Sequence, residues 1–183
     1  MAQQISTDIV HALNQDHRMV EDLLGRFEST EPNRRQEYFL AVVHELVRHE
    51  VAEEVVVYPT IRSDAPNGDA EADARIKEQA KAEEMLAKMQ DMDPMSAEFV
   101  AKFEALRSAV LEHAQAEEQH IFPLLQAVED DETRAKLGAK YERAKATAPT
   151  RLHPNAPDTP PGNKLLGPIA ALFDKARDAA RRG

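Results

Sequence analysis

Two copies of one polar word are the strongest chemical signal in this chain of 183 residues. The word His-x-x-x-Glu-Glu-x-x-aliphatic-aromatic-Pro occurs at residues 49–59 and again at residues 113–123. An imidazole and a carboxylate four residues apart lie on the same face of a helix, with their Cβ atoms about 6 Å apart. Nitrogen and oxygen ligands of this kind suit iron, manganese or zinc. The metal ligands predicted from the two words are His49, Glu53, His113 and Glu117.

A weaker repeat precedes each word. Residues 16–24 and 78–86 align, with His17 opposite Gln79. Because a repeat fixes the architecture of a protein, we interpret the chain as one helix–helix unit used twice. His17 then becomes a fifth predicted ligand, and Gln79 becomes the position where the two units differ.

Apolar residues recur at steps of three or four along four segments, and each predicted ligand falls on one of these apolar stripes. Short connections between the segments favour an all-α fold, an antiparallel up-down-up-down four-helix bundle with an approximate two-fold repeat. Pro32 suits the first turn of the second helix, and Asp93 followed by Pro94 predicts the start of the fourth. The four predicted helices cover about residues 7–29, 32–58, 70–92 and 94–128.

The rest of the chain predicts an extension to the bundle. Residues 129–146 either continue the fourth helix or form a short fifth one, which gives a bundle domain over residues 1–146. Residues 147–183 are rich in proline and end in a short amphipathic helix. That helix either packs on the bundle or meets a protein partner.

Composition excludes several kinds of protein. The chain has no cysteine, so disulfides, thiolate metal sites and a cysteine nucleophile are excluded. A formal net charge of −10 argues against a nucleic-acid-binding surface. No apolar run approaches the roughly 18 residues that a membrane helix needs, and the N-terminus lacks the pattern of a signal peptide. We therefore expect a cytoplasmic protein with no membrane or nucleic-acid partner.

The free-energy cost of burying charged carboxylates supports the metal site. Burying an ionised carboxylate costs several kcal/mol unless a partner compensates its charge. Glu53 and Glu117, each one turn from an inward histidine, need such a partner, and a cation provides it. Metal-bound histidines in turn need hydrogen-bond acceptors, a role we expect for Glu21 and Glu83, which occupy matching inward positions in the repeat.

The sequence resembles the hemerythrin-like family, whose module is called the HHE cation-binding domain. The resemblance covers about residues 7–128 and rests on Asp16-His17 together with the two His-x-x-x-Glu-Glu words. It implies a pair of irons joined by an oxygen bridge. By that pattern His17 and His49 bind one iron, His113 and position 79 bind the other, and Glu53 and Glu117 bridge them.

Gln79 departs from the family pattern, which has histidine at this position. Three outcomes are open. Gln79 or a water coordinates a more exposed second iron, Glu83 replaces the missing ligand, or only one metal binds tightly. We expect the first, an asymmetric dinuclear site.

Two further residues have alternative roles. Glu50 follows a ligand histidine and is either an extra ligand, as in some relatives, or a solvated neighbour. His120 lies two helical turns beyond His113, but its counterpart in the repeat is Val56, so a surface role competes with a metal-binding one.

The expected function follows from iron in a buried His/Glu site. We expect the protein to bind or react with dioxygen, peroxide or nitric oxide, and peroxide decomposition is the enzymatic activity this chemistry would allow. Two alternatives stay open: a metal- or oxygen-responsive regulatory module, or iron storage.

Overall fold

All regular structure in the described residues is helical. The computed structural model describes residues 8–89 and 91–148, and it contains no strand within them. The predicted all-α class is therefore confirmed. The C-terminal amphipathic helix and most of the proline-rich extension lie outside the described residues.

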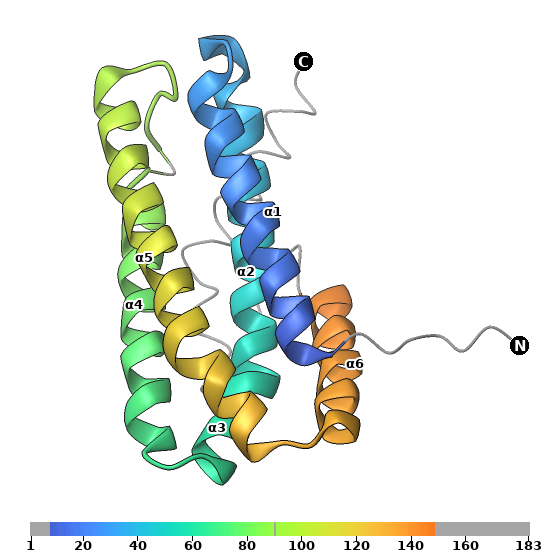
Figure 1. Cartoon of the computed structure of the whole chain (residues 1–183). Coiled ribbons are helices and arrows are strands. Elements are labelled where there is room, and N and C mark those ends of the chain that lie inside the picture. The colour runs from blue at the N-terminus through green and yellow to red at the C-terminus, as the bar shows by residue number, and fades with distance from the viewer. Residues whose placement is uncertain (1–7, 90, 149–183) are drawn as a thin grey trace, which may run out of the picture.

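Four long helices stand side by side, and neighbours along the chain run in opposite directions (Figure 1). Shorter elements join them: a 3-10 turn before α2, a π-helical turn after it, and the short helix α3. The elements are α1 (Ile9–Ser29), η1 (Pro32–Arg34), α2 (Arg35–Ala52), η2 (Glu53–Val57), α3 (Tyr58–Asp64), α4 (Gly68–Met89), α5 (Ala97–Val128) and α6 (Asp131–Thr147). No helix among the described residues combines the length and apolar character needed to cross a membrane.

The start of α5 corrects the sequence prediction. The helix begins at Ala97, because the Ser96 hydroxyl accepts a hydrogen bond from the Phe99 amide at 3.1 Å and so caps it. The predicted start at Asp93 and Pro94 is wrong. The Asp93 carboxylate instead accepts from the Met95 amide at 2.9 Å and closes a turn before the helix.

The two repeated words differ in their backbone. In the first copy α2, η2 and α3 follow one another without a loop, and the π turn η2 begins at Glu53. The Tyr58 amide bonds to the Glu53 carbonyl, five residues back, so Tyr58 lies one wide turn beyond Glu53. In the second copy α5 passes through residues 113–123 as uninterrupted α-helix, even with Pro123 inside it.

A tight turn joins α3 to α4. Asn67 has a φ of 56°, a left-handed conformation that asparagine tolerates better than most residues. At Gly68 an added Cβ would lie 1.9 Å from the carbonyl oxygen of Ile61. Only glycine fits such a close approach of two backbones.

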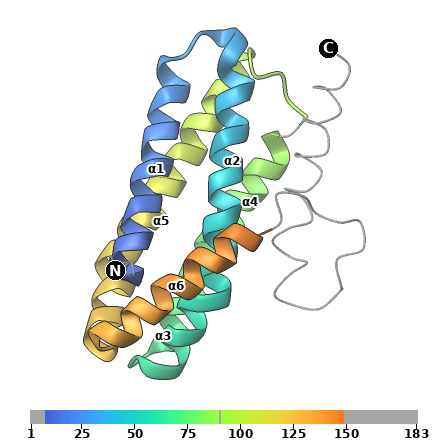
Figure 2. The same ribbon diagram turned by 90° about the vertical axis from the view of Figure 1, so that its right-hand side faces the viewer.

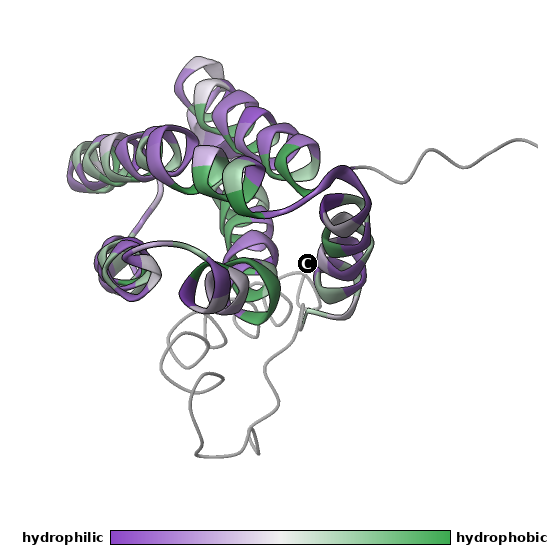
Figure 3. Cartoon of the chain, turned by 60° about the horizontal axis from the view of Figure 1, so that its bottom comes forward, coloured by the Kyte–Doolittle hydropathy of each residue, from purple (hydrophilic) through white to green (hydrophobic). Residues whose placement is uncertain are grey.

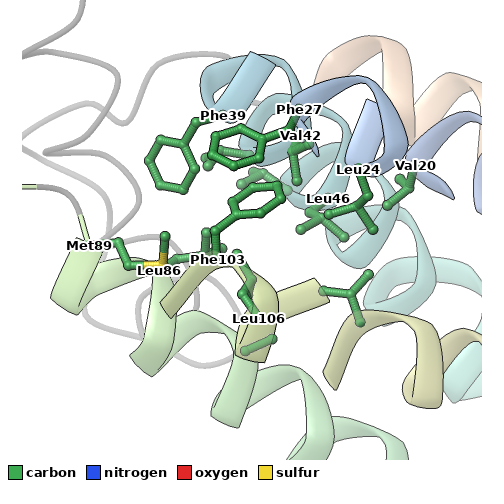
Figure 4. Close-up of a cluster of buried hydrophobic side chains, with 14 of the residues drawn as sticks. Val20, Leu24, Phe27, Phe39, Val42, Leu46, Leu86, Met89, Phe103 and Leu106 are labelled. Carbon is green, nitrogen blue, oxygen red and sulfur yellow. The ribbon is translucent and has the colours of Figure 1, made fainter. Parts of the chain in front are cut away.

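The helices enclose two apolar clusters, one toward each end of the bundle. In Figure 3 the hydrophobic residues lie mainly on the sides of the ribbons that face other helices, and the hydrophilic residues lie mainly on the outer sides. The first cluster is drawn in Figure 4, where the rings of Phe27 and Phe103 stack with centroids 3.5 Å apart. The second contains Ile9 and Leu13 of α1 with Ile121 and Leu125 of α5. Each of the four long helices contributes to these clusters along the stripe that the sequence predicts.

α6 is a separate short helix, which settles the two options left open for residues 129–146. Asp130 caps it by accepting a hydrogen bond from the Thr133 amide at 2.8 Å. Figure 2 shows α6 crossing the outside of the bundle obliquely, and it packs against α1, α2 and η2. It buries Leu137 and Tyr141 against the second apolar cluster.

Candidate metal centre

Four buried side chains converge between the two apolar clusters. They come from α1, α2, η2 and α5, and one potential ligand atom of each lies within 4.8 Å of all the others. Among residues 8–89 and 91–148, this is the one group in which three or more His, Asp or Glu side chains lie close enough to share a metal ion. Its members are His17, His49, Glu53 and Glu117.

Glu117 stands at the middle of the group. Its Oε2 atom lies 3.3 Å from His17 Nε2, 3.5 Å from His113 Nε2 and 4.0 Å from His49 Nε2. Glu53 Oε1 lies 3.1 Å from His49 Nε2. Three imidazoles thus lie around two carboxylates, one from η2 and one from α5.

The polar atoms that face one another here fit a cation. His17 Nε2, Glu53 Oε1 and Glu117 Oε2 are buried and have no hydrogen-bond partner. His113 Nε2 shares this property. A buried acceptor without a partner costs about 1–3 kcal/mol, and a charged one costs more. A divalent cation bound by these atoms removes that cost, and the nitrogen and carboxylate donor set suits iron, manganese or zinc.

Each imidazole is held by a hydrogen bond at its other nitrogen. His17 Nδ1 lies 3.0 Å from Glu118 Oε1, and His113 Nδ1 lies 2.9 Å from Glu78 Oε2. A carboxylate only accepts, so each Nδ1 carries a proton, and Nε2 is the ring nitrogen that faces inward. This arrangement orients a histidine for metal binding.

His49 has a longer chain of partners. Its Nδ1 lies 2.6 Å from the hydroxyl of Tyr141, which donates to Asp16 Oδ2 at 2.6 Å. Lys145 Nζ bonds the other oxygen of Asp16 at 2.5 Å. Asp16 and Lys145 also line an open surface pocket of about 970 Å³ between α1, α2 and α6. α6 therefore braces His49, one of the histidines of the cluster.

Gln79 and Tyr58 form a second set of contacts, on the other side of the carboxylates. The Gln79 amide nitrogen donates to Glu53 Oε2 at 2.8 Å and to the Tyr58 hydroxyl at 2.7 Å. The Tyr58 hydroxyl donates to Glu117 Oε1 at 2.8 Å. All four side chains are buried.

The electrostatics of the centre separates its two glutamates. Burial alone would raise the pKa of Glu117, but the charges of His113, His17 and His49 outweigh burial and hold that pKa well below its usual range. Burial and the neighbouring charge of Glu117 raise the pKa of Glu53. Burial opposes protonation of His49, yet the charge of Glu53 and the hydrogen bond to Asp16 raise its pKa. Metal binding must therefore displace protons from the cluster.

Two more acidic residues lie buried beside the centre. Burial, followed by the charge of Glu83, raises the pKa of Glu50 well above its usual range. Burial and the charge of Glu54 raise the pKa of Glu83 to about 8. Glu83 also has one oxygen, Oε1, without a hydrogen-bond partner. Glu50 is thus buried rather than solvated.

The remaining predicted positions lie away from the cluster. Glu21 is on the outer face of α1, with its side chain 53 % exposed and paired with Arg18 at 2.8 Å. It does not share the inward position of Glu83, contrary to our expectation from the repeat. His120 is exposed on α5, as the surface alternative for it predicted.

Six polar residues that contact the site had no role predicted from the sequence: Asp16, Tyr58, Glu78, Glu118, Tyr141 and Lys145. Tyr58 occupies the aromatic position of the repeated word, and Asp16 precedes a ligand, so their places in the motifs were signals available in the sequence. Tyr141 had no such signal, because it approaches His49 from 92 residues away.

Comparison with known proteins agrees with the geometry. The family model of the hemerythrin HHE cation binding domain matches residues 8–125. An uncharacterized hemerythrin-like protein of Schizosaccharomyces pombe is 33 % identical over 177 residues, which cover 94 % of this chain and 86 % of that protein. A protein of Nostoc sp. named DNA nickase is 27 % identical over 146 residues, which cover 79 % of this chain and 41 % of that protein. No solved structure matches the chain.

Proposed function

The chain belongs to the hemerythrin HHE cation-binding domain family, and we propose that it is a non-haem iron protein that binds or reacts with dioxygen, peroxide or nitric oxide. His17, His49, Glu53 and Glu117 would hold the iron, with His113 beside them. Bound iron supplies the redox chemistry toward these small molecules. The helices supply orientation and keep bulk water out of the centre.

One observation carries this proposal. Glu117 is buried and ionised among three imidazoles whose outer nitrogens are already held by hydrogen bonds, and its Oε2 has no hydrogen-bond partner. A packed core tolerates such a carboxylate when a cation completes its surroundings. The apolar clusters on both sides make that requirement stronger.

We infer in addition that the four long helices form an up-down-up-down bundle whose halves are related by an approximate two-fold axis. The repeated words and the approach of Glu53 and Glu117 from opposite sides support this arrangement. A nickase activity is not carried over from the Nostoc protein, because this chain matches 41 % of it and bears a net charge of −10.

The test is metal content followed by reactivity. Protein purified from its own host should contain iron, and the iron-loaded protein should change its optical spectrum with nitric oxide or peroxide. Peroxide decomposition needs no other reductant, since two peroxide molecules give one dioxygen and two waters. A His49→Ala variant should lose the iron, whereas Glu84→Gln, which alters an exposed pair with Lys88, should retain it. Protein with no iron, or iron inert to all three molecules, would refute the proposal.

A regulatory module is the second candidate, and the brace from α6 favours it. Tyr141 and Lys145 reach His49 and Asp16 from the helix that leads into residues 149–183. Metal binding at His49 would then stabilise α6. Comparison of the protease resistance of α6 in metal-free and iron-loaded protein tests this, and equal resistance would remove the support for it.

A further inference from the structure

The two oxygens of each central glutamate have different surroundings. Glu53 Oε1 and Glu117 Oε2 face the imidazoles and have no hydrogen-bond partner. Glu53 Oε2 and Glu117 Oε1 face Gln79 and Tyr58 and each accepts a hydrogen bond of 2.8 Å. The carboxylates therefore present one face to a cation and the other to N–H and O–H donors.

Every hydrogen on the second face has an acceptor, while the Gln79 carbonyl oxygen Oε1 is buried without a hydrogen-bond partner. The Gln79 amide has two hydrogens, and they have acceptors in Glu53 Oε2 and the Tyr58 oxygen. The single Tyr58 hydrogen goes to Glu117 Oε1 at 2.8 Å, which is shorter than its 3.4 Å approach to Glu53 Oε2. Reversing the amide would leave Glu53 Oε2 without its 2.8 Å donor. A cation bridging Glu53 Oε2 and Glu117 Oε1 would meet the two hydrogens that already point at them.

The backbone places these donors. The π turn puts Tyr58 one wide turn beyond Glu53, so that its hydroxyl reaches between the two carboxylates. At the matching place in α5 the residue is Phe122, which has no hydroxyl and stacks on His17 with ring centroids 5.4 Å apart. In space His17 thus packs against Phe122 of the other helix pair, whereas Gln79, its counterpart in the repeat, donates to Tyr58.

We propose that Gln79 and Tyr58 form a hydrogen-bonded cap in place of the second cation of the family's dinuclear site, so that this centre binds one cation tightly. That cation is held by the group His17, His49, Glu53 and Glu117. The inference rests on the proposed function, because it concerns the same metal site. It replaces our expectation of an asymmetric dinuclear centre. Gln79 acts in it as a donor to a ligand and not as a ligand.

The experiment is a metal titration of the full chain with ferrous iron under anaerobic conditions, followed by calorimetry. Wild-type protein should bind one tight equivalent. The double variant Gln79→His with Tyr58→Phe reproduces the contact pair of His17 with Phe122 and should bind two, with the affinity for the second equivalent raised about 10- to 100-fold. Gln126→His places a histidine on the exposed face of α5 and should leave the titration unchanged.

Electron paramagnetic resonance after oxidation gives an independent measurement that needs no variant. One ferric ion per wild-type chain gives the signal of an isolated high-spin ion, and this signal should account for all bound iron. Two tight equivalents in the wild type, or a magnetically coupled silent pair, would overturn the cap while leaving the iron site intact. A folded double variant that still binds one equivalent would overturn it too. A wild type that binds no tight equivalent would instead refute the proposed function.

Discussion

The two copies of the helix pair have nearly the same sequence motif, but they differ at the single positions that decide what each copy can bind. The first copy supplies two imidazoles, His17 and His49, which both belong to the four-residue metal group. The second supplies Gln79 and His113, of which neither is a member. A repeat thus predicts where side chains meet, whereas the substitutions within it decide what each half can bind.

The largest difference should appear on removal of the paired histidines. His49→Ala deletes a member of the metal group and should weaken iron binding about 1000-fold, equivalent to about 4 kcal/mol. His113→Ala, its counterpart, should weaken binding about tenfold, because the four-residue group remains. Calorimetric titration checks both, with exposed His120→Ala as the control. Equal losses for the two histidines would mean that the halves bind metal equivalently.

The paired aromatic residues should differ in the kind of stability they provide. Phe122→Ala removes a buried ring stacked on His17 and should lower the free energy of unfolding by about 3 kcal/mol. Tyr58→Phe keeps the ring but strips a donor from Glu117, which should cost about 1–2 kcal/mol. Urea unfolding of the metal-free proteins measures both. A Tyr58→Phe variant as stable as the wild type would show that the cap contributes no stability.

The paired glutamates should respond differently to pH. Burial raises the pKa of Glu83 from 4.5 to about 8, so the folded state keeps the proton that the unfolded chain loses. The free energy of unfolding of metal-free protein should therefore fall as pH rises from about 4.5 to about 8. Glu83→Gln should remove part of this decline and stabilise the protein at pH 8 by about 2 kcal/mol. Its counterpart Glu21, exposed and paired with Arg18, provides the control, and Glu21→Gln should change stability little. An identical pH dependence in wild type and Glu83→Gln would contradict this account.

The smallest expected effect concerns the brace from α6, which reaches the first half alone. Tyr141→Phe removes the 2.6 Å hydrogen-bond partner of His49 Nδ1 and should weaken iron binding about tenfold. Tyr38→Phe alters a half-buried tyrosine beside Arg34 and should leave the affinity unchanged. Unaltered affinity in Tyr141→Phe would assign α6 a purely structural role.

Periodicity and repetition predicted much of the fold and of the ligand cluster. Apolar steps of three and four placed the predicted ligands on buried helix faces, and the His-x-x-x-Glu spacing brought imidazoles and carboxylates together. The start of α5 was predicted wrongly, because two residues that can cap a helix, Asp93 and Ser96, lie three positions apart. Ser96 caps the helix, and Asp93 closes the turn before it. The outward position of Glu21 could not be read from an alignment that treats both copies as equal.

Long-range contacts and local backbone irregularity limited the rest. The π turn at Glu53 has no periodic signature, and it alone makes Tyr58 part of the site while the matching Phe122 is a packing residue. Tyr141 meets His49 across 92 residues, a contact decided by how α6 lies over the bundle. Polar side chains recruited by tertiary packing leave no spacing pattern to detect.

The backbone contact at Gly68 fixes how α4, in the second helix pair, follows α3 of the first. The Ile61 carbonyl packs closely against Gly68, so the connection between α3 and α4 leaves little room for movement. This contact fixes the rotation of α4 about its axis at the first residue of the helix. Gln79 lies eleven residues further along, about three helical turns. A rotation or shift of α4 at this connection would move the Gln79 amide away from the Glu53 carboxylate that accepts its hydrogen bond. The place of Gln79 in the candidate metal centre therefore depends on a backbone contact some 16 Å away, where a single methyl group has no room.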